Sequence, residues 1–419
     1  MSDEVVLGQI ETCCAPSVIE MQSTFIASGT SNGQERPLKS ATRCAPARRM
    51  PIATFAWITV FCAACGQPPP PFVPGEARLW DLNTNELQHR FEALGRAVTF
   101  AAFTPDGATL ITSSVGDQEL SITPVVRFWN ATTGKYQASL PRGTCNGTCI
   151  ALAPNGKMLA TGNTEGTTFL FDVPTGGLVA KFEGHASPII AVAFSPDSKT
   201  VASAGKDEVV RLWDTSTHRL RTMLRGHRGS MGQLLFSPDG KTLATTPRTE
   251  FVVVLWDLET GQERATLSAS GILAFSPNGR TLATLRPDDA VRIWDISAAK
   301  ECAKLEVQNP AARILKFSPD GKTIATTSHG VLVNLSHAGD GREIGELRGH
   351  KDIVRCVAFS PDGSTLATGS RDGVVMVWNL STNRPIATLR GHVRTVYCIA
   401  FSPDGRSLIV GAGDIEPHI

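Results

Sequence analysis

The chain has 419 residues, more than one ordinary domain needs, so its length allows two or three domains or one large repeat architecture. Its 40 Lys and Arg residues nearly balance its 39 Asp and Glu residues, which argues against a strongly basic surface, and no nucleic-acid partner is expected. With 42% hydrophobic residues and no uninterrupted apolar run near about twenty residues, the chain is predicted to be globular and not to cross a membrane repeatedly.

The first 65 residues hold a tail and one apolar segment. Residues 1–49 are expected to be disordered or to precede the true translation start. Residues 50–65, MPIATFAWITVFCAAC, follow the basic pair Arg48 and Arg49 and match the apolar centre of a secretory signal in length and composition. Two interpretations stay open for them: an export or anchor segment, and a buried or interfacial segment of an irregular tail.

The end of this segment resembles the processing site of bacterial lipoproteins, because Cys65 directly follows Ala63 and Ala64. The resemblance implies that Cys65 becomes the lipidated first residue of the mature chain and tethers it to a membrane. We therefore expect an exported, membrane-anchored protein in the periplasm or at the cell surface in preference to a cytoplasmic one.

Residues 66–76 are predicted to form an extended linker. They contain four consecutive prolines, and proline fixes its own backbone angle and lacks a hydrogen-bond donor, so neither a helix nor a central strand forms there. Residues 77–419 are predicted to form one repeat domain.

The repeat domain carries two recurring signatures, and a period of about 42 residues is typical of repeat architectures. The first is a turn, which appears as FTPDG at 103, LAPNG at 152, FSPDS at 194, FSPDG at 236, FSPNG at 275 and FSPDG at 317, 359 and 401. The second ends at Asp81, Asn130, Asp172, Asp214, Asp257, Asp295, Asn334 and Asn379, as in RLWD or MVWN. Six of the seven tryptophans occupy one slot of this second signature.

Each unit reads as four strands. Apolar, β-branched runs of five to seven residues are cut by Pro, Asp and Gly, as in IIAVAF, TVASAG and EVVRLWD between 189 and 214. A more polar fourth strand follows at about 219–225, where alternating Leu and Thr residues suit an outer strand with one exposed side.

These units resemble the WD40 family, because Gly-His pairs at 184, 226, 349 and 391 precede the first strand at that family's spacing. The nearly unchanged FSPDGKT and LATGS segments are similar to bacterial members. The resemblance implies an all-β propeller in which a His, a Ser or Thr, an Asp and a Trp of one unit bond together. Two units supply all four residues, namely His185, Ser203, Asp207 and Trp213, and His350, Thr368, Asp372 and Trp378. The sixth unit has no aromatic residue at Asn334.

Counting the units predicts eight blades. The chain enters with a third and a fourth strand at about 77–92, runs through seven full units, and leaves with a first and a second strand at about 395–411. Pairing the two chain ends would close the ring and satisfy strand edges that otherwise stay open. In this closure Trp80 would meet His392 and Asp414 across the junction. A seven-bladed ring with leftover or truncated units is the alternative.

No catalytic, cofactor or metal site is predicted. The His, Ser and Asp of one unit look like a hydrolase triad, but they recur with a tryptophan at matching positions, which favours a structural network. No phosphate-binding loop, HExxH or paired CxxC element occurs. Cys145 and Cys149 flank a blade junction, and both a disulfide and two buried thiols remain open for them.

Protein binding is therefore the expected function, on a monomeric scaffold. The WD40 resemblance implies docking on the face that carries the Gly-His loops and the turns between second and third strands. The candidates there are Lys206, Arg228, Arg248, Lys351, Arg371, Arg394 and Tyr397, a mildly basic set that predicts an acidic peptide or protein partner. A membrane-anchored envelope scaffold is the alternative, and an enzyme with a site at the channel mouth is the remote one.

Overall fold

The computed structural model describes residues 74–413 apart from 94, 116–123, 146–148, 228, 248–250, 270, 286–289, 307–313, 329 and 393. In this part of the chain the regular structure consists of strands, and no helix is long and apolar enough to span a membrane. The predictions for the tail, the apolar segment with Cys65 and the linker up to residue 73 lie outside the described residues, as do those for Arg228, Arg248 and Asp414.

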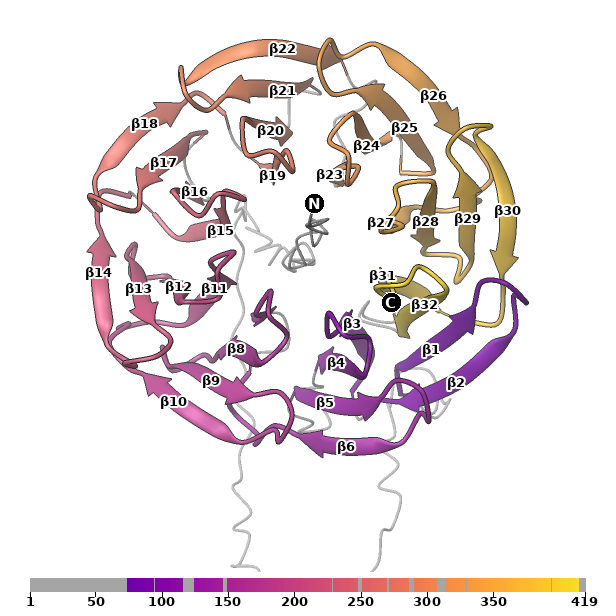
Figure 1. The fold of residues 1–419 in the computed structure, drawn as a ribbon, viewed down its shortest axis with the longest axis horizontal. Coiled ribbons are helices and arrows are strands. Elements are labelled where there is room, and N and C mark those ends of the chain that lie inside the picture. Colours follow the sequence, from indigo (N-terminus) through magenta and orange to yellow (C-terminus); the bar gives the residue numbers. More distant parts are fainter. Residues whose placement is uncertain are drawn as a thin grey trace, which may run out of the picture. The chain divides into compact units, whose positions relative to one another are not determined.

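The described residues form a closed ring of antiparallel four-stranded blades (Figure 1). Seven blades are made of four strands that follow one another in the chain. Blades 1 to 3 are β3 Ala97–Phe103, β4 Thr109–Val115, β5 Val125–Asn130 and β6 Tyr136–Ser139; β7 Ile150–Leu152, β8 Met158–Gly162, β9 Thr168–Asp172 and β10 Leu178–Phe182; and β11 Ile189–Phe194, β12 Thr200–Gly205, β13 Val210–Asp214 and β14 Leu220–Leu224.

Blades 4 to 7 continue the same pattern around the ring. They are β15 Met231–Phe236, β16 Thr242–Pro247, β17 Val253–Asp257 and β18 Glu263–Leu267; β19 Ile272–Phe275, β20 Thr281–Leu285, β21 Ala290–Asp295 and β22 Lys300–Glu306; β23 Leu315–Phe317, β24 Thr323–Ser328, β25 Leu332–His337 and β26 Glu343–Leu347; and β27 Val354–Phe359, β28 Thr365–Ser370, β29 Val375–Asn379 and β30 Arg384–Leu389.

Blade 8 is assembled from both ends of the described chain. Its first two strands are β31 Thr395–Phe401 and β32 Ser407–Gly413, and its last two are β1 Glu76–Asp81 and β2 Leu87–Glu92. Strands β1 and β32 pair antiparallel without interruption from Glu76 opposite Ala412 to Asp81 opposite Ser407. We call this pairing the seam. It confirms the predicted closure and gives eight blades, so the seven-bladed alternative is wrong.

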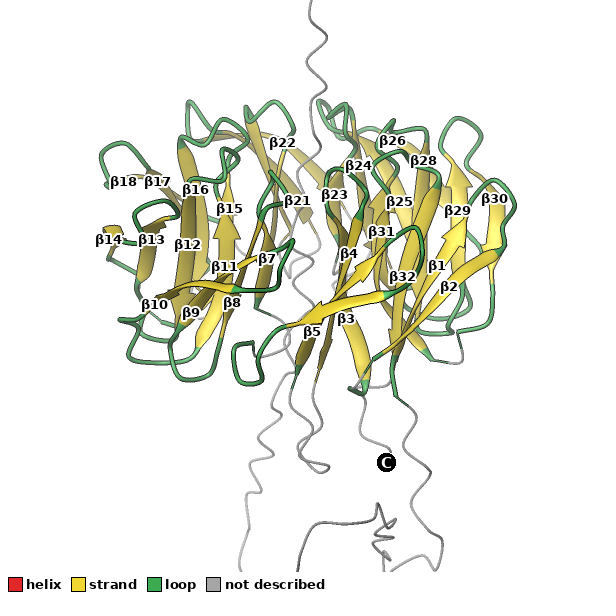
Figure 2. Cartoon of the chain, turned by 60° about the horizontal axis from the view of Figure 1, so that its bottom comes forward, coloured by secondary structure: helices red, strands yellow, loops and turns green. Residues whose placement is uncertain are grey.

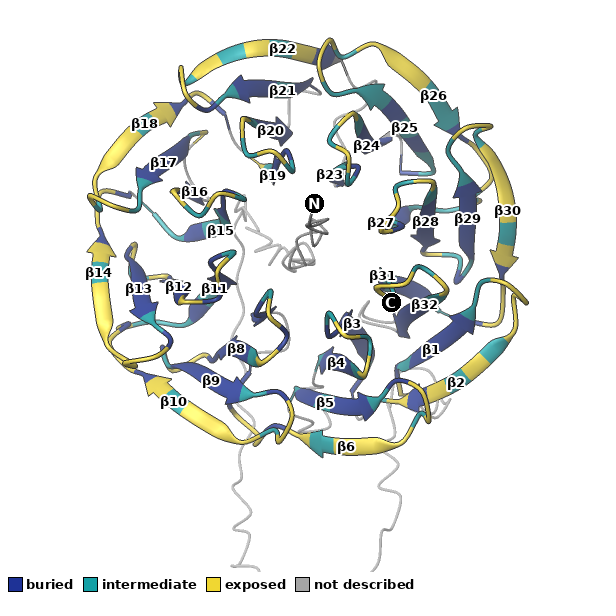
Figure 3. Cartoon of the chain, viewed as in Figure 1, coloured by how far each residue is buried: buried dark blue, intermediate teal, exposed yellow. Residues whose placement is uncertain are grey.

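The outer strand is the most exposed strand of a blade, whereas the second strand is the most consistently buried one (Figure 3). Every residue of β12 is buried, whereas three of the five residues of β14 are exposed. The core lies between neighbouring blades: the Trp213 ring stacks on Phe182 of the preceding blade, with ring centroids 5.0 Å apart. Each blade is therefore completed by its neighbours, as repeat proteins require.

The recurring Pro-Asp turn joins first and second strands through a fixed set of hydrogen bonds. In blade 3, Ser195 Oγ donates to Asp197 Oδ1 over 2.6 Å, and the Lys199 amide donates to the same oxygen over 3.0 Å. The Thr200 amide donates to Ser195 Oγ over 2.9 Å. Ser198 has a φ of 60° where the other turns of this kind have glycine, which adopts that conformation without strain.

One prediction about blade 6 is wrong. The sequence signature VLVN aligned Asn334 with Asn379 and so put Val333 in the tryptophan slot, but Ile324 pairs with Ser336, as Leu366 pairs with Trp378 in blade 7. The slot therefore belongs to Ser336, three residues after Val333. The error arose because VLVN resembles MVWN in letters while the alternation of buried residues along β25 follows the later register.

Candidate functional site

Loops and turns gather at two faces of the ring (Figure 2). We call the first the loop face; it carries the connections between blades, such as 183–188, and the turns between second and third strands, such as 206–209. We call the second the turn face; it carries the turns from first to second and from third to fourth strands, such as 195–199 and 215–219. Antiparallel order in every blade produces this division.

In blade 3 a chain of hydrogen bonds runs from the core to the loop face. Trp213 Nε1 donates to Ser203 Oγ over 2.9 Å, and the same hydroxyl lies 2.9 Å from His185 Nε2. His185 Nδ1 lies 2.8 Å from Asp207 Oδ1, and Arg211 forms an ion pair with Asp207 at 2.8 Å. The geometry fits a neutral imidazole that donates from Nδ1 to the carboxylate and accepts the hydroxyl proton at Nε2.

The pKa values of this chain are consistent with that assignment. Burial lowers the pKa of His185 and outweighs the hydrogen bond and charge of Asp207, so the ring stays neutral. Burial alone would raise the pKa of Asp207, but hydrogen bonds from His185 and Arg211 outweigh it and hold the pKa below its ordinary value. A neutral histidine is thus held against a carboxylate that remains charged.

Blade 7 repeats the arrangement more loosely. Trp378 Nε1 donates to Thr368 Oγ1 over 2.9 Å, and that hydroxyl lies 2.6 Å from His350 Nε2. His350 Nδ1 is 4.0 Å from Asp372 Oδ1, while Asp372 Oδ2 accepts a hydrogen bond from the Lys351 amide. The carboxylate therefore ties the second-to-third turn to the Gly-His loop.

Neither hydroxyl is placed for catalysis. Ser203 and Thr368 are each 0% exposed, and each oxygen accepts the indole N–H of its blade. A nucleophile must reach its substrate, so these triads act on the fold rather than on a ligand.

The same hydroxyl-to-indole bond occurs in three further blades, where the sequence supplies no complete set of four residues. The pairs are Trp129 with Thr112, Trp256 with Thr245, and Trp294 with Thr284, at 2.9 to 3.0 Å. In blade 4, His227 Nε2 also lies 3.1 Å from Thr245 Oγ1, and burial lowers the pKa of His227 to about 4. A Ser or Thr at the fourth position of the second strand was the signal that could have found these pairs.

The seam departs from this pattern. Val410 faces Arg78 in the register where Ser203 faces Arg211, so a valine stands at the hydroxyl position. Trp80 and His392 meet with ring centroids 6.5 Å apart, but Trp80 Nε1 and His392 Nε2 have no hydrogen-bond partner among the described residues.

Two charged residues of β1 stand beside the seam histidine. Arg78 forms an ion pair with Glu76 at 2.6 Å, and His392 Nδ1 lies 3.5 Å from the same Glu76 oxygen. Glu76 therefore takes the part that Asp207 plays in blade 3, but from a strand of the other chain end.

Of the predicted binding residues that the structure describes, four lie in loops or turns of the loop face, and Tyr397 lies in strand β31. Lys206, Lys351 and Arg371 are exposed, whereas Arg394 and Tyr397 are half-buried. Their backbones are held in place: the Lys206 amide donates to the Pro188 carbonyl and the Arg371 amide to the Ile353 carbonyl.

Blades 7 and 8 bring Arg371 and Arg394 onto adjacent loops. Gly373 lies between them with a φ of 75°, and a Cβ atom there would lie 2.3 Å from the His392 carbonyl oxygen and 3.0 Å from that of Arg394. Only glycine allows this approach. The two arginines, distant in sequence by half a repeat, thus belong to one area of the loop face.

Cys145 and Cys149 are buried thiols rather than a disulfide, with Cys145 Sγ 3.8 Å from the Cys149 carbonyl oxygen. Within the described ranges no group of three or more His, Cys, Asp or Glu side chains is arranged to hold a metal ion.

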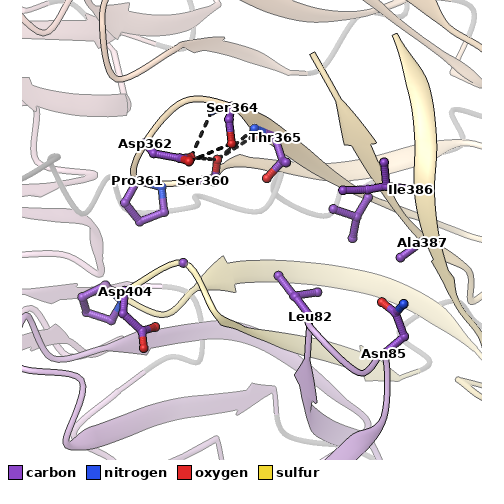
Figure 4. Close-up of a pocket in the computed structure, with 13 residues that line it drawn as sticks. Leu82, Asn85, Ser360, Pro361, Asp362, Ser364, Thr365, Ile386, Ala387 and Asp404 are labelled. Atoms are coloured by element: carbon purple, nitrogen blue, oxygen red, sulfur yellow. Dashed lines mark hydrogen bonds between the residues drawn. The ribbon is translucent and has the colours of Figure 1, made fainter. Parts of the chain in front are cut away.

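The turn face carries a pocket of about 550 Å³ between blades 7 and 8 (Figure 4). It is lined from three parts of the chain: the turn at 360–365 and strand residues of blade 7, the turn at 403–405, and the turn of the N-terminal strand pair at 82–85. Sequence analysis did not find it, because its lining comes from both chain ends.

Comparison with known proteins finds repeats of one kind. The family model of the WD domain, G-beta repeat, matches residues 176–214, 218–257, 341–379 and 383–414. Each match begins in or just before a fourth strand and continues into the next blade, so one sequence repeat spans two blades.

Among curated proteins, the meiotic recombination protein rec14 of Schizosaccharomyces pombe is 29% identical over 121 residues. That match covers 27% of this chain and 36% of rec14, so the chain spans about a third of the relative's length.

Proposed function

We propose that this WD40-repeat chain, folded as an eight-bladed propeller, is a non-catalytic scaffold that binds protein partners through its loop face. WD40 repeats generally mediate protein–protein interaction. We infer that the ring acts as a monomer and that its partners are peptides or proteins rather than nucleic acid, since the net charge is only +1.

The observation that supports this proposal most is the fixed basic area at blades 7 and 8. Lys351 and Arg371 are exposed side chains on backbones pinned by hydrogen bonds, and Arg394 lies on the adjoining loop. Side chains presented on rigid loops lose little backbone entropy on binding, and arginine is frequent among interface anchors. Their positive charge complements an acidic segment of a partner.

The test is a quantitative pull-down from the native host with the wild-type chain and the double variant Arg371→Glu, Arg394→Glu. Loss of partners from the double variant, at unchanged thermal midpoint, is expected. The matched control is Lys135→Glu, Arg342→Glu, which makes the same charge change at exposed positions of the turn face. Recovery of the same partners at the same yield by the Arg371, Arg394 variant would show that the chosen face is wrong.

We further propose that the scaffold is exported and anchored through Cys65. The support is the apolar run at 50–65, with Ala63 and Ala64 directly before the cysteine. In a bacterial host, an acyl group at Cys65 in the mass spectrum and accumulation of a precursor under globomycin are expected. An unprocessed chain with an unmodified Cys65 contradicts the anchor without touching the proposed binding face.

A further inference from the structure

The pocket between blades 7 and 8 opens on the turn face, away from the loops used above. Its two ends differ in chemistry. Asp362 and Asp404 lie at one end, and Leu82, Ile386 and Ala387 lie at the other (Figure 4). An occupant that suits both ends must offer a cation and an apolar group a short distance apart.

The apolar end of the pocket includes a large aliphatic side chain that is mostly exposed. Ile386 is 56% exposed on the outer strand β30, and it lines the pocket together with Val377, which is buried, and with Leu82 and Ala387, which are partly buried. The same position of the outer strand holds Gln in blades 1 and 8, Arg in blades 3 and 4, and Cys in blade 5. Blades 2 and 6 also carry an aliphatic residue there, but Val179 and Ile344 are less exposed, at 40% and 37%. Covering this exposed aliphatic side chain with an apolar partner removes its surface from water, which favours binding.

One of the two carboxylates at the acidic end, Asp362, belongs to a turn that has no Lys or Arg. In six of the other seven turns of this kind, a Lys or Arg stands two residues after the Asp or Asn. The seventh, in blade 1, has Ala108 at that position. Lys322, for example, lies 3.7 Å from Asp320. The corresponding residue in blade 7 is Ser364, whose hydroxyl donates to Asp362 Oδ2 over 2.8 Å.

Both pocket carboxylates stay ionised. Hydrogen bonds from Ser360 and Ser364 lower the pKa of Asp362, and no cation is among the groups that lower it. The hydrogen bond from Ser402 lowers the pKa of Asp404, to which Arg406 adds a smaller effect. Asp362 is therefore an ionised carboxylate whose own turn supplies no cation, so it can pair with a cation of an occupant.

We propose that this pocket is a second docking site, which binds a linear segment of a protein partner carrying an aliphatic side chain within two residues of an Arg or Lys. The aliphatic side chain packs among Leu82, Ile386 and Ala387, and the cation faces Asp362. The pocket volume lies within the range of sites that hold small ligands or anchor side chains.

This site extends the proposed scaffold function but does not depend on the loop face. A propeller that binds an acidic segment on one face and a basic, aliphatic segment on the other can hold two partners at once. Because the pocket is lined by residues from both chain ends, its occupant also contacts both halves of blade 8.

The test uses a phage library of random heptapeptides, selected against the immobilised full-length chain. Synthetic copies of the enriched peptides are then measured by fluorescence anisotropy. We expect enriched peptides to pair an aliphatic residue with an Arg or Lys, and Ser364→Lys and Ile386→Gln each to weaken binding at least about tenfold. Both substitutions place a residue that other blades already carry at the same position, so the ring is expected to fold.

Two matched variants control for charge and hydrophobicity. Ala108→Lys makes the cation change in the other turn that lacks one, and Val179→Gln removes the aliphatic residue at the same outer-strand position of blade 2; neither is expected to alter binding. Equal affinity for wild-type and the Ser364→Lys and Ile386→Gln variants overturns the proposal. So does sensitivity only to the Arg371, Arg394 double variant, which would place the peptides on the loop face and leave the scaffold function standing.

Discussion

Replacing Val410 with threonine should strengthen the closure of the ring. In five blades an indole N–H donates to a Ser or Thr hydroxyl, and Val410 holds that position at the seam. Thr368 shows the geometry to expect, with its oxygen 2.9 Å from Trp378 Nε1 and 2.6 Å from His350 Nε2. Val410→Thr would therefore offer one hydroxyl to both Trp80 and His392.

The magnitude follows from opposing effects. Each new hydrogen bond contributes about 1 kcal/mol net, because the hydroxyl replaces the water contacts that the buried Trp80 N–H and His392 ring nitrogen lose on folding. Loss of one buried methyl group costs about 0.8 kcal/mol. We expect the free energy of unfolding to rise by about 1 to 2 kcal/mol and the thermal midpoint by roughly 2 to 4 °C.

Calorimetry and hydrogen exchange check this expectation. Amides in the pairing of β1 with β32 should exchange about tenfold more slowly in Val410→Thr, since about 1.4 kcal/mol corresponds to a factor of ten. Val210→Thr, at a fully buried third-strand position, is the control and should be destabilised by about 1 to 3 kcal/mol. If Val410→Thr lowers the thermal midpoint as much as Val210→Thr does, the account of the seam is refuted.

Three further results are expected. Thr368→Val leaves the buried Trp378 and His350 nitrogens without their hydroxyl and should lower the free energy of unfolding by about 2 to 3 kcal/mol in denaturant titrations; an unchanged value contradicts the structural role of the network. The folded-state pKa of His227 is about 4 and its ordinary value is 6.5, so the unfolded chain binds more protons between these values. The free energy of unfolding should therefore fall as the pH falls from 6.5 to 4. In denaturant titrations at fixed pH steps, His227→Gln should make this dependence on pH less steep. Gly373→Ala should destabilise the ring by more than Gly143→Ala, since both have a positive φ but a Cβ at Gly143 meets nothing within 4 Å; equal thermal midpoints would contradict the close approach of the loops.

The blade count and the closure could be predicted because the residues that recur in each repeat fix the local backbone geometry. The Pro-Asp-Gly turn and the tryptophan slot recur at nearly constant spacing, and the leftover strands at the two ends complement one another. Blade 6 shows the limit of this approach. Blade 6 has no aromatic residue to mark the slot, so the match of VLVN to MVWN ended the signature at Asn334, whereas strand pairing ends it at His337.

The pocket could not be predicted, for a different reason. Leu82 and Ile386 are distant in sequence, and each is an ordinary residue of its own unit. Only the closed ring brings them together at the apolar end of one pocket. The basic residues of the loop face were easier to find, because a position in the repeat already assigns a residue to one face.

The seam also orders events during synthesis. Strand β1 leaves the ribosome early, but its partner β32 is made more than 300 residues later, roughly 15 to 65 s at usual elongation rates. Throughout that interval the nascent chain carries an N-terminal hairpin with one open edge, which can capture another nascent chain as readily as its own terminus. Crowded polysomes would therefore favour entangled products, and chaperones that shield this hairpin until termination would raise the yield of closed rings.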